Sequence, residues 1–454
     1  MSTEFRPAHE IKHLLRLAIP VVITQLGLMA MGIVDIAMVG PLGIDAIGAV
    51  SLGEVWVFGT TVVAMGLLFG LDPLLAQAHG ARDTRSVGLG LQRGLVMAVA
   101  LSVPLMVLWT YTGDAMKLLG QDPDLIREAQ RFADAQIFSA APVLIFNVLR
   151  QFLQCRNQVL PIVCVTIAAN LFNYAGNWVF VYGNLGCPAL GVYGSGLATG
   201  VTKVLLMGGL ATWILVRRLG ADVWIPWSRA ALHMSGFLQI CRYGLPVAVQ
   251  VALEVWLFQA TSLIAGKLGT SELAAHIITL KIASLSFMMP LGISIASAVR
   301  IGNLIGAGDR PGAQRAAWLA FGLGAAIMAV WALVFVIFRW ELSTFFTTDQ
   351  EVIALSAAIF PIAAAFQIFD GLQAVGAGIL RGNADTLPAA LFSCAGFWLV
   401  AMPCVWLFAK QWNGGLPGIW WGLSVGLAVV AACFVAWVAW RGPRRERGRL
   451  VAED

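Results

Sequence analysis

The stretch AQRAAWLAFGLGAAIMAVWALVFVIF, residues 313–338, contains one charged residue, Arg315. A helix needs about 20 residues to cross the hydrocarbon core of a bilayer, so this stretch is long enough to span a membrane. The rest of the 454-residue chain is similar, since 59% of its residues are hydrophobic and only 12% are charged. Soluble chains carry about 25% charged residues. With a mean hydropathy of +0.81, the sequence predicts an all-α polytopic membrane protein.

Breaks made by Gly, Pro and charge clusters divide the chain into twelve predicted transmembrane helices. They cover roughly residues 14–39, 46–78, 91–112, 130–154, 160–182, 189–218, 237–266, 273–303, 313–338, 352–380, 388–409 and 416–440.

Most Lys and Arg residues fall on one side of this arrangement, together with both termini. The positive-inside rule then places both termini in the cytoplasm, which is the topology expected of a multi-pass protein of the inner (cytoplasmic) membrane. The basic tail at residues 441–454 is expected to rest against anionic lipid. The net charge of +5 is therefore explained without a nucleic-acid partner.

An internal repeat appears when the chain is shifted by 226 residues. Pro20 then aligns with Pro246, Gly40 with Gly266, and Asp83 with Asp309. A constant register over this distance predicts two six-helix halves, and because six is even the halves are parallel repeats. We expect an N-terminal lobe at 1–218, a cytoplasmic linker at 219–236 and a C-terminal lobe at 237–440. In this arrangement a substrate cavity is expected between the lobes.

Acidic residues inside the spans do not follow the repeat. Asp35 lies in LMAMGIVDIAMVG, residues 28–40, and the second half has Thr261 at that position, whereas Glu254 aligns with Leu28. An ionised carboxylate in the middle of a bilayer costs about 2.5–3.5 kcal/mol on insertion scales. Because the scaffold is symmetric and the acids are not, their placement favours a functional role. The alternative is a neutral Asp35 that only joins two helices by a hydrogen bond.

Polar residues of the fifth and sixth spans are candidates to surround Asp35. Asn170, Asn173 and Asn177 share one helical face, and Thr199 lies among small residues that permit close approach. Together with Asp35 these groups would form an oxygen-rich pocket for a proton or Na⁺. The alternative is a purely structural polar stripe that holds helices together.

The second half offers two further acids. Gln250 and Glu254 share a face of the seventh span, and Gln367, Asp370 and Gln373 share a face of the tenth. Two carboxylates that lie close together repel each other when both are ionised. A proton or Na⁺ is therefore expected at Glu254 and Asp370. The three glutamines are candidates to line the substrate cavity.

Two lysines inside the spans are harder to interpret. Lys281 either pairs with Glu254 or Asp370, lines the cavity, or extends to the membrane interface. Lys203 has no partner that the sequence identifies.

The sequence contains no HExxH motif, nucleophile elbow or P-loop. We therefore expect no enzyme activity and no cofactor, and a transporter of this kind would run on an ion gradient.

These features resemble the multidrug and toxic compound extrusion (MATE) family over essentially the whole chain. The resemblance is carried by IPVVITQLGLMAMGIVDIAMVGPLG and LPVAVQVALEVWLFQATSLIAGKLG, which open the two halves, by AQAHGARD and GNLIGAGDR, and by GAGILRGNADTLP. The acids Asp35, Glu254 and Asp370 match the family's NorM-type branch. The resemblance implies a V-shaped fold of twelve helices and cation sites at Asp35, Asn173, Asn177 and Thr199, and at Glu254 with Asp370.

The function implied is an antiporter that exports amphipathic organic cations and other drugs by alternating access, driven by H⁺ or Na⁺ and acting as a monomer in the bilayer. Some branches have an acid where this chain has Asn177, so its first-half site carries one charge fewer. The alternative is a flippase for a lipid-linked precursor. Such a flippase would be expected to carry several cationic residues in its cavity, whereas here acids outnumber bases within the spans.

Overall fold

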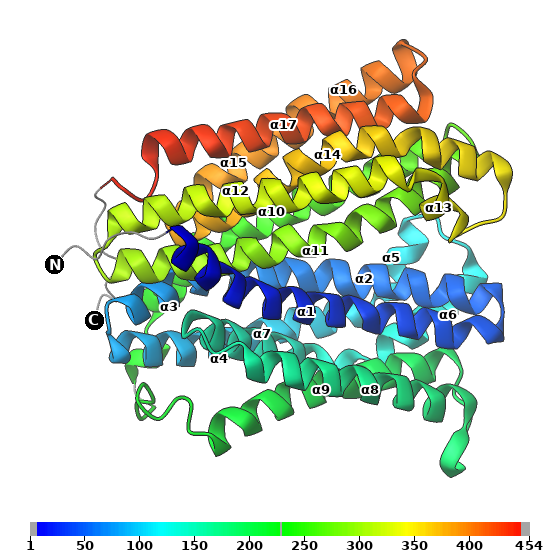
Figure 1. The fold of residues 1–454 in the computed structure, drawn as a ribbon. Helices are drawn as coiled ribbons and strands as arrows, with labels where there is room; N and C mark the ends of the chain where they lie inside the picture. Colours follow the sequence, from blue (N-terminus) through cyan, green and yellow to red (C-terminus); the bar gives the residue numbers. More distant parts are fainter. Residues whose placement is uncertain (1–6, 228, 446–454) are drawn as a thin grey trace. The chain divides into compact units, whose positions relative to one another are not determined.

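Helices make up most of the described part of the chain, residues 7–227 and 229–445 of a computed structural model, in which no strand occurs (Figure 1). The helices of the first half are α1 (Pro7–Val39), α2 (Ile44–Leu68), α3 (Leu71–Gly80), α4 (Thr84–Thr110), α5 (Thr112–Leu118), α6 (Pro123–Asp134), α7 (Ala140–Cys155), α8 (Leu160–Tyr182) and α9 (Val192–Val216). Those of the second half are α10 (Met234–Gly266), α11 (Thr270–Gly306), α12 (Arg310–Ile337), α13 (Arg339–Thr344), α14 (Gln350–Gly382), α15 (Thr386–Cys394), α16 (Met402–Trp406) and α17 (Gly415–Arg441).

Twelve segments of the described chain are long and apolar enough to cross a membrane, as predicted. The prediction was wrong at the start of the fourth span, which begins at Ile137 and not at residue 130. Residues before it form the separate helix α6, which begins with Asp122 as N-cap and Pro123 in its first turn. The charged residues of α6 do not suit hydrocarbon, so this helix ends before the span starts.

The repeat seen in the sequence recurs in the helices. α1 and α10 each contain 33 residues with an internal proline, Pro20 or Pro246. α4 and α12 each begin at an Asp N-cap: Asp83 accepts a hydrogen bond from the Ser86 N–H at 3.0 Å, and Asp309 accepts one from the Gly312 N–H at 2.8 Å. An N-cap side chain satisfies a backbone donor that the first turn leaves free. The aspartates at this position therefore start corresponding helices.

The chain divides into two compact units. Among the described residues, the N-unit contains Ile23–His79 and Asp83–Ala248, and the C-unit contains residues 249–445 together with Gly80–Arg82 and α1 up to Val22. Each unit thus includes the beginning of the other half's first helix.

Equivalent glycines accommodate these exchanged helix beginnings. In the N-unit, a Cβ on Gly66 of α2 would lie 2.6 Å from the Cα of Ala248 of α10. In the C-unit, a Cβ on Gly292 of α11 would lie 2.3 Å from a methyl carbon of Val22 of α1. Only glycine permits such close packing at these positions.

An ion pair also fixes the beginning of α1 within the C-unit. The Arg300 guanidinium of α11 donates to both carboxylate oxygens of Glu10, at 2.6 and 2.7 Å. Such bidentate pairs are geometrically specific.

The linker between the halves packs on the N-unit. The Gln92 amide donates to the Ile225 carbonyl at 2.7 Å, and the Arg93 guanidinium donates to the Ala230 carbonyl at 3.1 Å. Of the predicted basic tail, residues 446–454 lie outside the described part of the chain.

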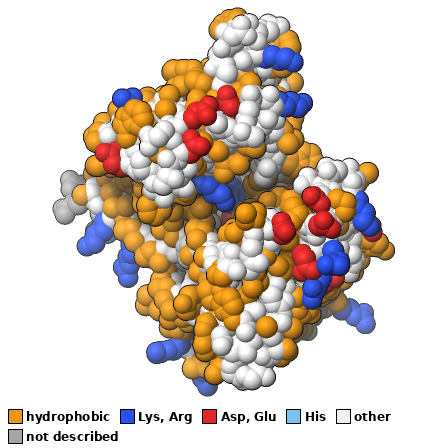
Figure 2. Space-filling view, turned by 90° about the vertical axis from the view of Figure 1, so that its right-hand side faces the viewer, with side chains coloured by type: hydrophobic (Ala, Val, Ile, Leu, Met, Phe, Trp, Pro, Cys, Tyr) orange, Lys and Arg blue, Asp and Glu red, His pale blue; other side chains and the backbone are white. Residues whose placement is uncertain are grey.

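Charged and hydrophobic side chains share the exposed surface. Figure 2 shows a face on which acidic and basic side chains lie beside large areas covered by hydrophobic side chains. Exposed residues such as Val99, Val103 and Leu263 belong to this apolar covering. This distribution suits a protein that crosses a bilayer.

Candidate cation site and second carboxylate pair

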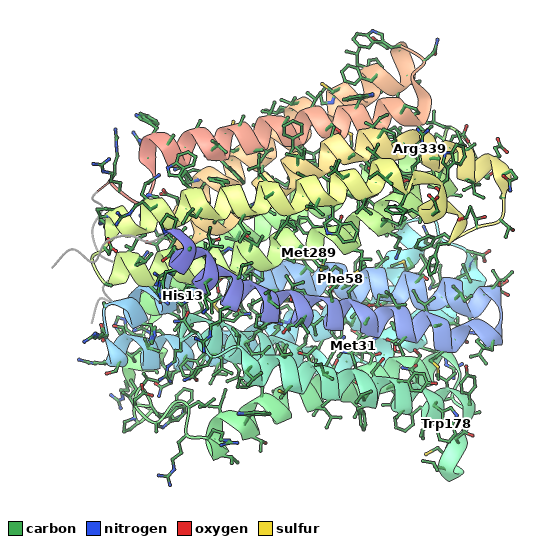
Figure 3. The ribbon with its side chains drawn as sticks, viewed as in Figure 1. His13, Met31, Phe58, Trp178, Met289 and Arg339 are labelled. Atoms are coloured by element: carbon green, nitrogen blue, oxygen red, sulfur yellow. The ribbon has the colours of Figure 1, made fainter. Side chains whose placement is uncertain are left out.

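Asp35 lies in the N-unit on the last turn but one of α1, which ends at Val39. Its side chain has no exposed surface. Figure 3 labels Met31, one turn before Asp35 on α1, and Trp178, which follows Asn177 on α8. The site is therefore built from helices of one unit, close to the connection between α1 and α2.

Three neutral side chains donate hydrogen bonds to the Asp35 carboxylate. The Asn177 and Asn173 amides of α8 donate to its Oδ1 at 2.8 and 3.1 Å. The Thr199 hydroxyl of α9 donates to its Oδ2. The predicted meeting of Asp35, Asn173, Asn177 and Thr199 is thus present, because their faces on three helices converge.

The two asparagines also supply unused acceptors. The Oδ1 atoms of Asn173 and Asn177 are buried and have no hydrogen-bond partner among the described residues. A buried amide oxygen without a partner is unfavourable by about 1–3 kcal/mol. Carboxylate, amide and hydroxyl oxygens are ligands that hard cations prefer. The chemistry of these groups therefore suits Na⁺ as well as a proton on Asp35, and in this structure the amide nitrogens, not the oxygens, face the carboxylate.

Asn170, the third residue of the predicted polar face, is not part of this site. Its amide donates to the Thr166 carbonyl one turn earlier at 2.9 Å. A Cβ on Gly27 of α1 would lie 3.2 Å from its nitrogen, so Asn170 packs against α1 about two turns away from Asp35. It packs between helices, as expected for a polar stripe that only holds helices together.

Two charged residues near Asp35 were not assigned to the site from the sequence. Lys203 lies one turn after Thr199 on α9, and its Nζ donates a hydrogen bond to the Gln136 Oε1 at 2.6 Å. The i, i+4 spacing of Thr199 and Lys203 is the signal that could have placed Lys203 here. Glu54 of α2 is the other: a Cβ on Gly32 of α1, one turn before Asp35, would lie 3.1 Å from the Glu54 Oε1.

The C-unit holds the second pair of acids. Asp370 of α14 is buried and lies three residues before Gln373 on that helix. The Gln373 amide donates to the Glu254 Oε2 at 3.3 Å. The predicted closeness of Glu254, Asp370 and Gln373 is therefore present.

The remaining predicted residues of the second half are spread more widely. Gln367 is buried and donates to the Ser286 hydroxyl at 2.6 Å, and Gln250 is also buried. The side-chain oxygens of Gln367 and Gln373 are buried without a hydrogen-bond partner in the described chain. Lys281 is exposed on α11 and forms no ion pair with Glu254 or Asp370 in this structure.

Both clusters are made of carboxylates, amides and hydroxyls. No group of three or more His, Cys, Asp or Glu that could hold a metal ion occurs among the residues the structure describes. Each cluster thus places a carboxyl group beside the amide of a neighbouring helix.

Comparison with known proteins shows a full-length relationship. The sequence profile of the MatE family matches residues 20–179 and 246–407. The probable multidrug resistance protein NorM of Mesorhizobium japonicum is 38% identical over 96% of this chain and 94% of its own length. The multidrug resistance protein NorM of Aliivibrio fischeri is 31% identical over 96% of both chains.

The fold of this chain also matches the folds of solved structures. The eukaryotic MATE transporter AtDTX14 superposes with a TM-score of 0.89 at 25% identity, covering 96% of this chain and 97% of its own. These proteins are named as resistance proteins and transporters, which confirms the expectation that this chain is not an enzyme.

Proposed function

The chain belongs to the MatE family, and on that premise we propose that it exports amphipathic organic cations and other drugs in exchange for inward H⁺ or Na⁺. The relatives named multidrug resistance protein support the class of substrate. The observation that carries the ion coupling is the Asp35 carboxylate, buried in a membrane-spanning helix and held by neutral donors alone within hydrogen-bond distance.

The proposed cycle depends on competition at the carboxylates. An ionised Asp35 accepts hydrogen bonds from α8 and α9 and so ties α1 to both helices. A proton on Asp35 turns one acceptor into a donor, and Na⁺ takes up its lone pairs. Either ion changes how α1 is held, and an ion that binds two conformations unequally shifts their populations.

The C-unit acids would contribute in the same way. Loss of an ion from Glu254 or Asp370 leaves a negative charge that attracts a cationic drug. Gln250, Gln367, Gln373 and Lys281 are proposed to face the drug, and the free oxygens of Gln367 and Gln373 would accept hydrogen bonds from an ammonium group.

The proposal includes a topology. With both termini in the cytoplasm of an inner membrane, the connection between α1 and α2 faces outside, and Asp35 is then reached by ions from that side. One copy of the chain contains both carboxylate clusters, so we propose that the monomer is the working unit.

The test is export of a fluorescent organic cation from liposomes that contain the purified protein, with a pH gradient and a Na⁺ gradient imposed separately. We expect export on at least one gradient. Asp35→Asn should abolish this export, whereas Asp45→Asn, which removes an exposed carboxylate of α2, should not. Folded protein that exports on neither gradient would overturn the proposal and direct attention to lipid-linked substrates.

A further inference from the structure

The linker between α9 and α10 exposes large hydrophobic side chains, although it lies outside the membrane-spanning helices. The spans on either side of it are Val192–Val216 and Met234–Gly266. Between them Trp224, Trp227 and Leu232, here called the linker face, are 52%, 53% and 61% exposed. The two indole rings meet edge to face, with their centroids 6.4 Å apart. Tryptophan is enriched where a bilayer meets water.

The smaller apolar neighbours of the linker face are buried instead. Val223 is 3% exposed and Ala231 has no exposed surface, and each directly adjoins a residue of the linker face. A Cβ on Gly88 of α4 would clash with the Val223 carbonyl oxygen, and the Gln92 amide donates to the Ile225 carbonyl at 2.7 Å. The linker backbone is therefore held on α4 with its larger apolar side chains turned outward. A loop surrounded by water would gain more by burying the larger side chains.

The linker face continues an apolar side of α10. Met234, Leu238 and Leu245 are exposed, and their spacing of i, i+4 and i+11 places them on one side of the helix. Met234 begins α10 only two residues after Leu232. The exposed apolar surface of a membrane-spanning helix thus extends into the linker.

The exposed charge beside the linker face is positive. Arg217 and Arg218 directly follow α9, Arg229 lies within the linker, and all three are exposed. Asp222 is the linker's acidic residue, and the Arg156 guanidinium donates to both of its carboxylate oxygens, at 2.6 and 2.8 Å. The three exposed arginines therefore complement the negative charge of anionic lipid headgroups.

We propose that the linker is an interfacial anchor, which places the linker face among the headgroups of the adjoining leaflet and binds anionic phospholipid through the three exposed arginines. Because the linker is bonded to α4, the anchor holds the N-unit, and not only a loop, at the membrane surface. In the topology proposed above this leaflet is the cytoplasmic one (Figure 1). The inference goes beyond the proposed export and requires neither a drug nor a coupling ion.

The test is hydrogen–deuterium exchange of the whole protein in nanodiscs, made either of phosphatidylcholine alone or of phosphatidylcholine with phosphatidylglycerol. Anionic lipid should draw the basic linker into the headgroups, so its amides should exchange at least about threefold more slowly when phosphatidylglycerol is present. Residues 183–191, which connect α8 and α9 and contain no charged side chain, are the internal control and should exchange equally in both lipids. Equal exchange of the linker in both lipids would refute the binding of anionic lipid and would leave the linker face to a protein partner.

A charge variant tests the role of the arginines. Arg217→Gln/Arg218→Gln/Arg229→Gln changes only exposed side chains, and it should abolish the dependence on phosphatidylglycerol while exchange in phosphatidylcholine stays as in the wild type. A triple variant that keeps the dependence would overturn the proposed lipid contacts. Neither result bears on export, so the proposed function stands or falls separately.

A second variant tests the tryptophans. Trp224→Ser/Trp227→Ser should speed exchange of the linker in both lipids, because the side chains that enter the interface are gone. Trp412→Ser removes an exposed tryptophan of another connection and should leave the linker unchanged. Equal linker exchange in the double variant and the wild type would refute the insertion of the linker face. If the double variant does not fold, the arginine variant decides alone.

Discussion

Asp35 is held by hydrogen bonds from two amides and a hydroxyl, and Lys203, one turn after Thr199, is positioned by Gln136 and Trp109. Neutral donors stabilise a carboxylate without neutralising its negative charge. The site can therefore keep its shape while an ion is bound or released. A direct Asp–Lys pair would have removed the need for an ion.

Asn177 reaches the carboxylate, whereas Asn170 on the same helix does not. Asn177→Ala removes a 2.8 Å hydrogen bond to Asp35, and hydrogen bonds to charged groups are worth about 1.5–3 kcal/mol. We expect the apparent affinity for the coupling ion, measured from export against ion concentration, to change by about 10- to 100-fold. Asn170→Ala, on the same helix, should leave it unchanged. Equal effects of the two would mean that the polar face acts through packing.

At the scale of the residue, spacing along one helix predicted the polar face that meets Asp35, and likewise placed Asp370 and Gln373 on one face. It could not separate Asn170 from Asn173 and Asn177, because helix rotation decides which part of a polar face meets a partner, and the resemblance to the MATE family made that distinction and added Thr199. Glu54 and Lys203 were missed because they lie on other helices, and only tertiary packing brings each of them to the region of Asp35.

Helix α2 contains two glycines in different surroundings. Gly66→Ala would place a Cβ 2.6 Å from the Ala248 backbone and should destabilise the protein by about 1–3 kcal/mol through overpacking. Nothing lies within 4 Å of a Cβ on Gly59, so Gly59→Ala should be neutral or stabilising by up to about 1 kcal/mol through helix propensity. Thermal unfolding of both variants in detergent measures the difference. Equal melting temperatures would contradict the close packing of α2 on α10.

The N-cap of α4 should give stability that depends on pH. Partial burial tends to raise the pKa of Asp83, but hydrogen bonds from the Ser86 hydroxyl and amide, with the charge of Arg85, lower the pKa below its usual 3.8. Because the folded state has the lower pKa, this contribution is present above about pH 4 and is lost as the pH falls below it.

Two substitutions separate the cap from its charge. Asp83→Asn keeps a good capping side chain without the ionisable group, so it should retain neutral-pH stability and lose this part of the acid dependence. Asp83→Ala should lower the free energy of unfolding by about 0.5–2 kcal/mol at neutral pH. Melting temperatures between pH 3 and pH 7 provide the measurement. An Asn variant with unchanged acid dependence would show that Asp83 is not the titrating group.

At the scale of the element, the lengths of the apolar stretches and the breaks at Gly and Pro predicted all twelve membrane helices. The start of the fourth was misplaced because an amphipathic helix, α6, adjoins it with a short 3₁₀ turn between them. The exchange of helix beginnings between the two units also went unpredicted. It depends on the close contacts at Gly66 and Gly292, which the hydropathy pattern does not encode.

For the whole molecule, the proposed topology places the connection between α8 and α9 outside the membrane. That connection contains the partly exposed Cys187. A membrane-impermeant maleimide should therefore label intact cells that express the protein, and Cys187→Ser should lose this labelling. Labelling of Cys187 only after the membrane is opened would reverse the topology and place Asp35 near the inner face.

Coupling between drug and ion is the central claim for the molecule. Its most direct measurement uses liposomes loaded with an organic cation and diluted into drug-free buffer without an ion gradient, while H⁺ or Na⁺ uptake is followed. Exchange predicts ion uptake that stops when the drug is omitted and is absent in Asp35→Asn. Drug release without any ion uptake by the wild-type protein would contradict the account.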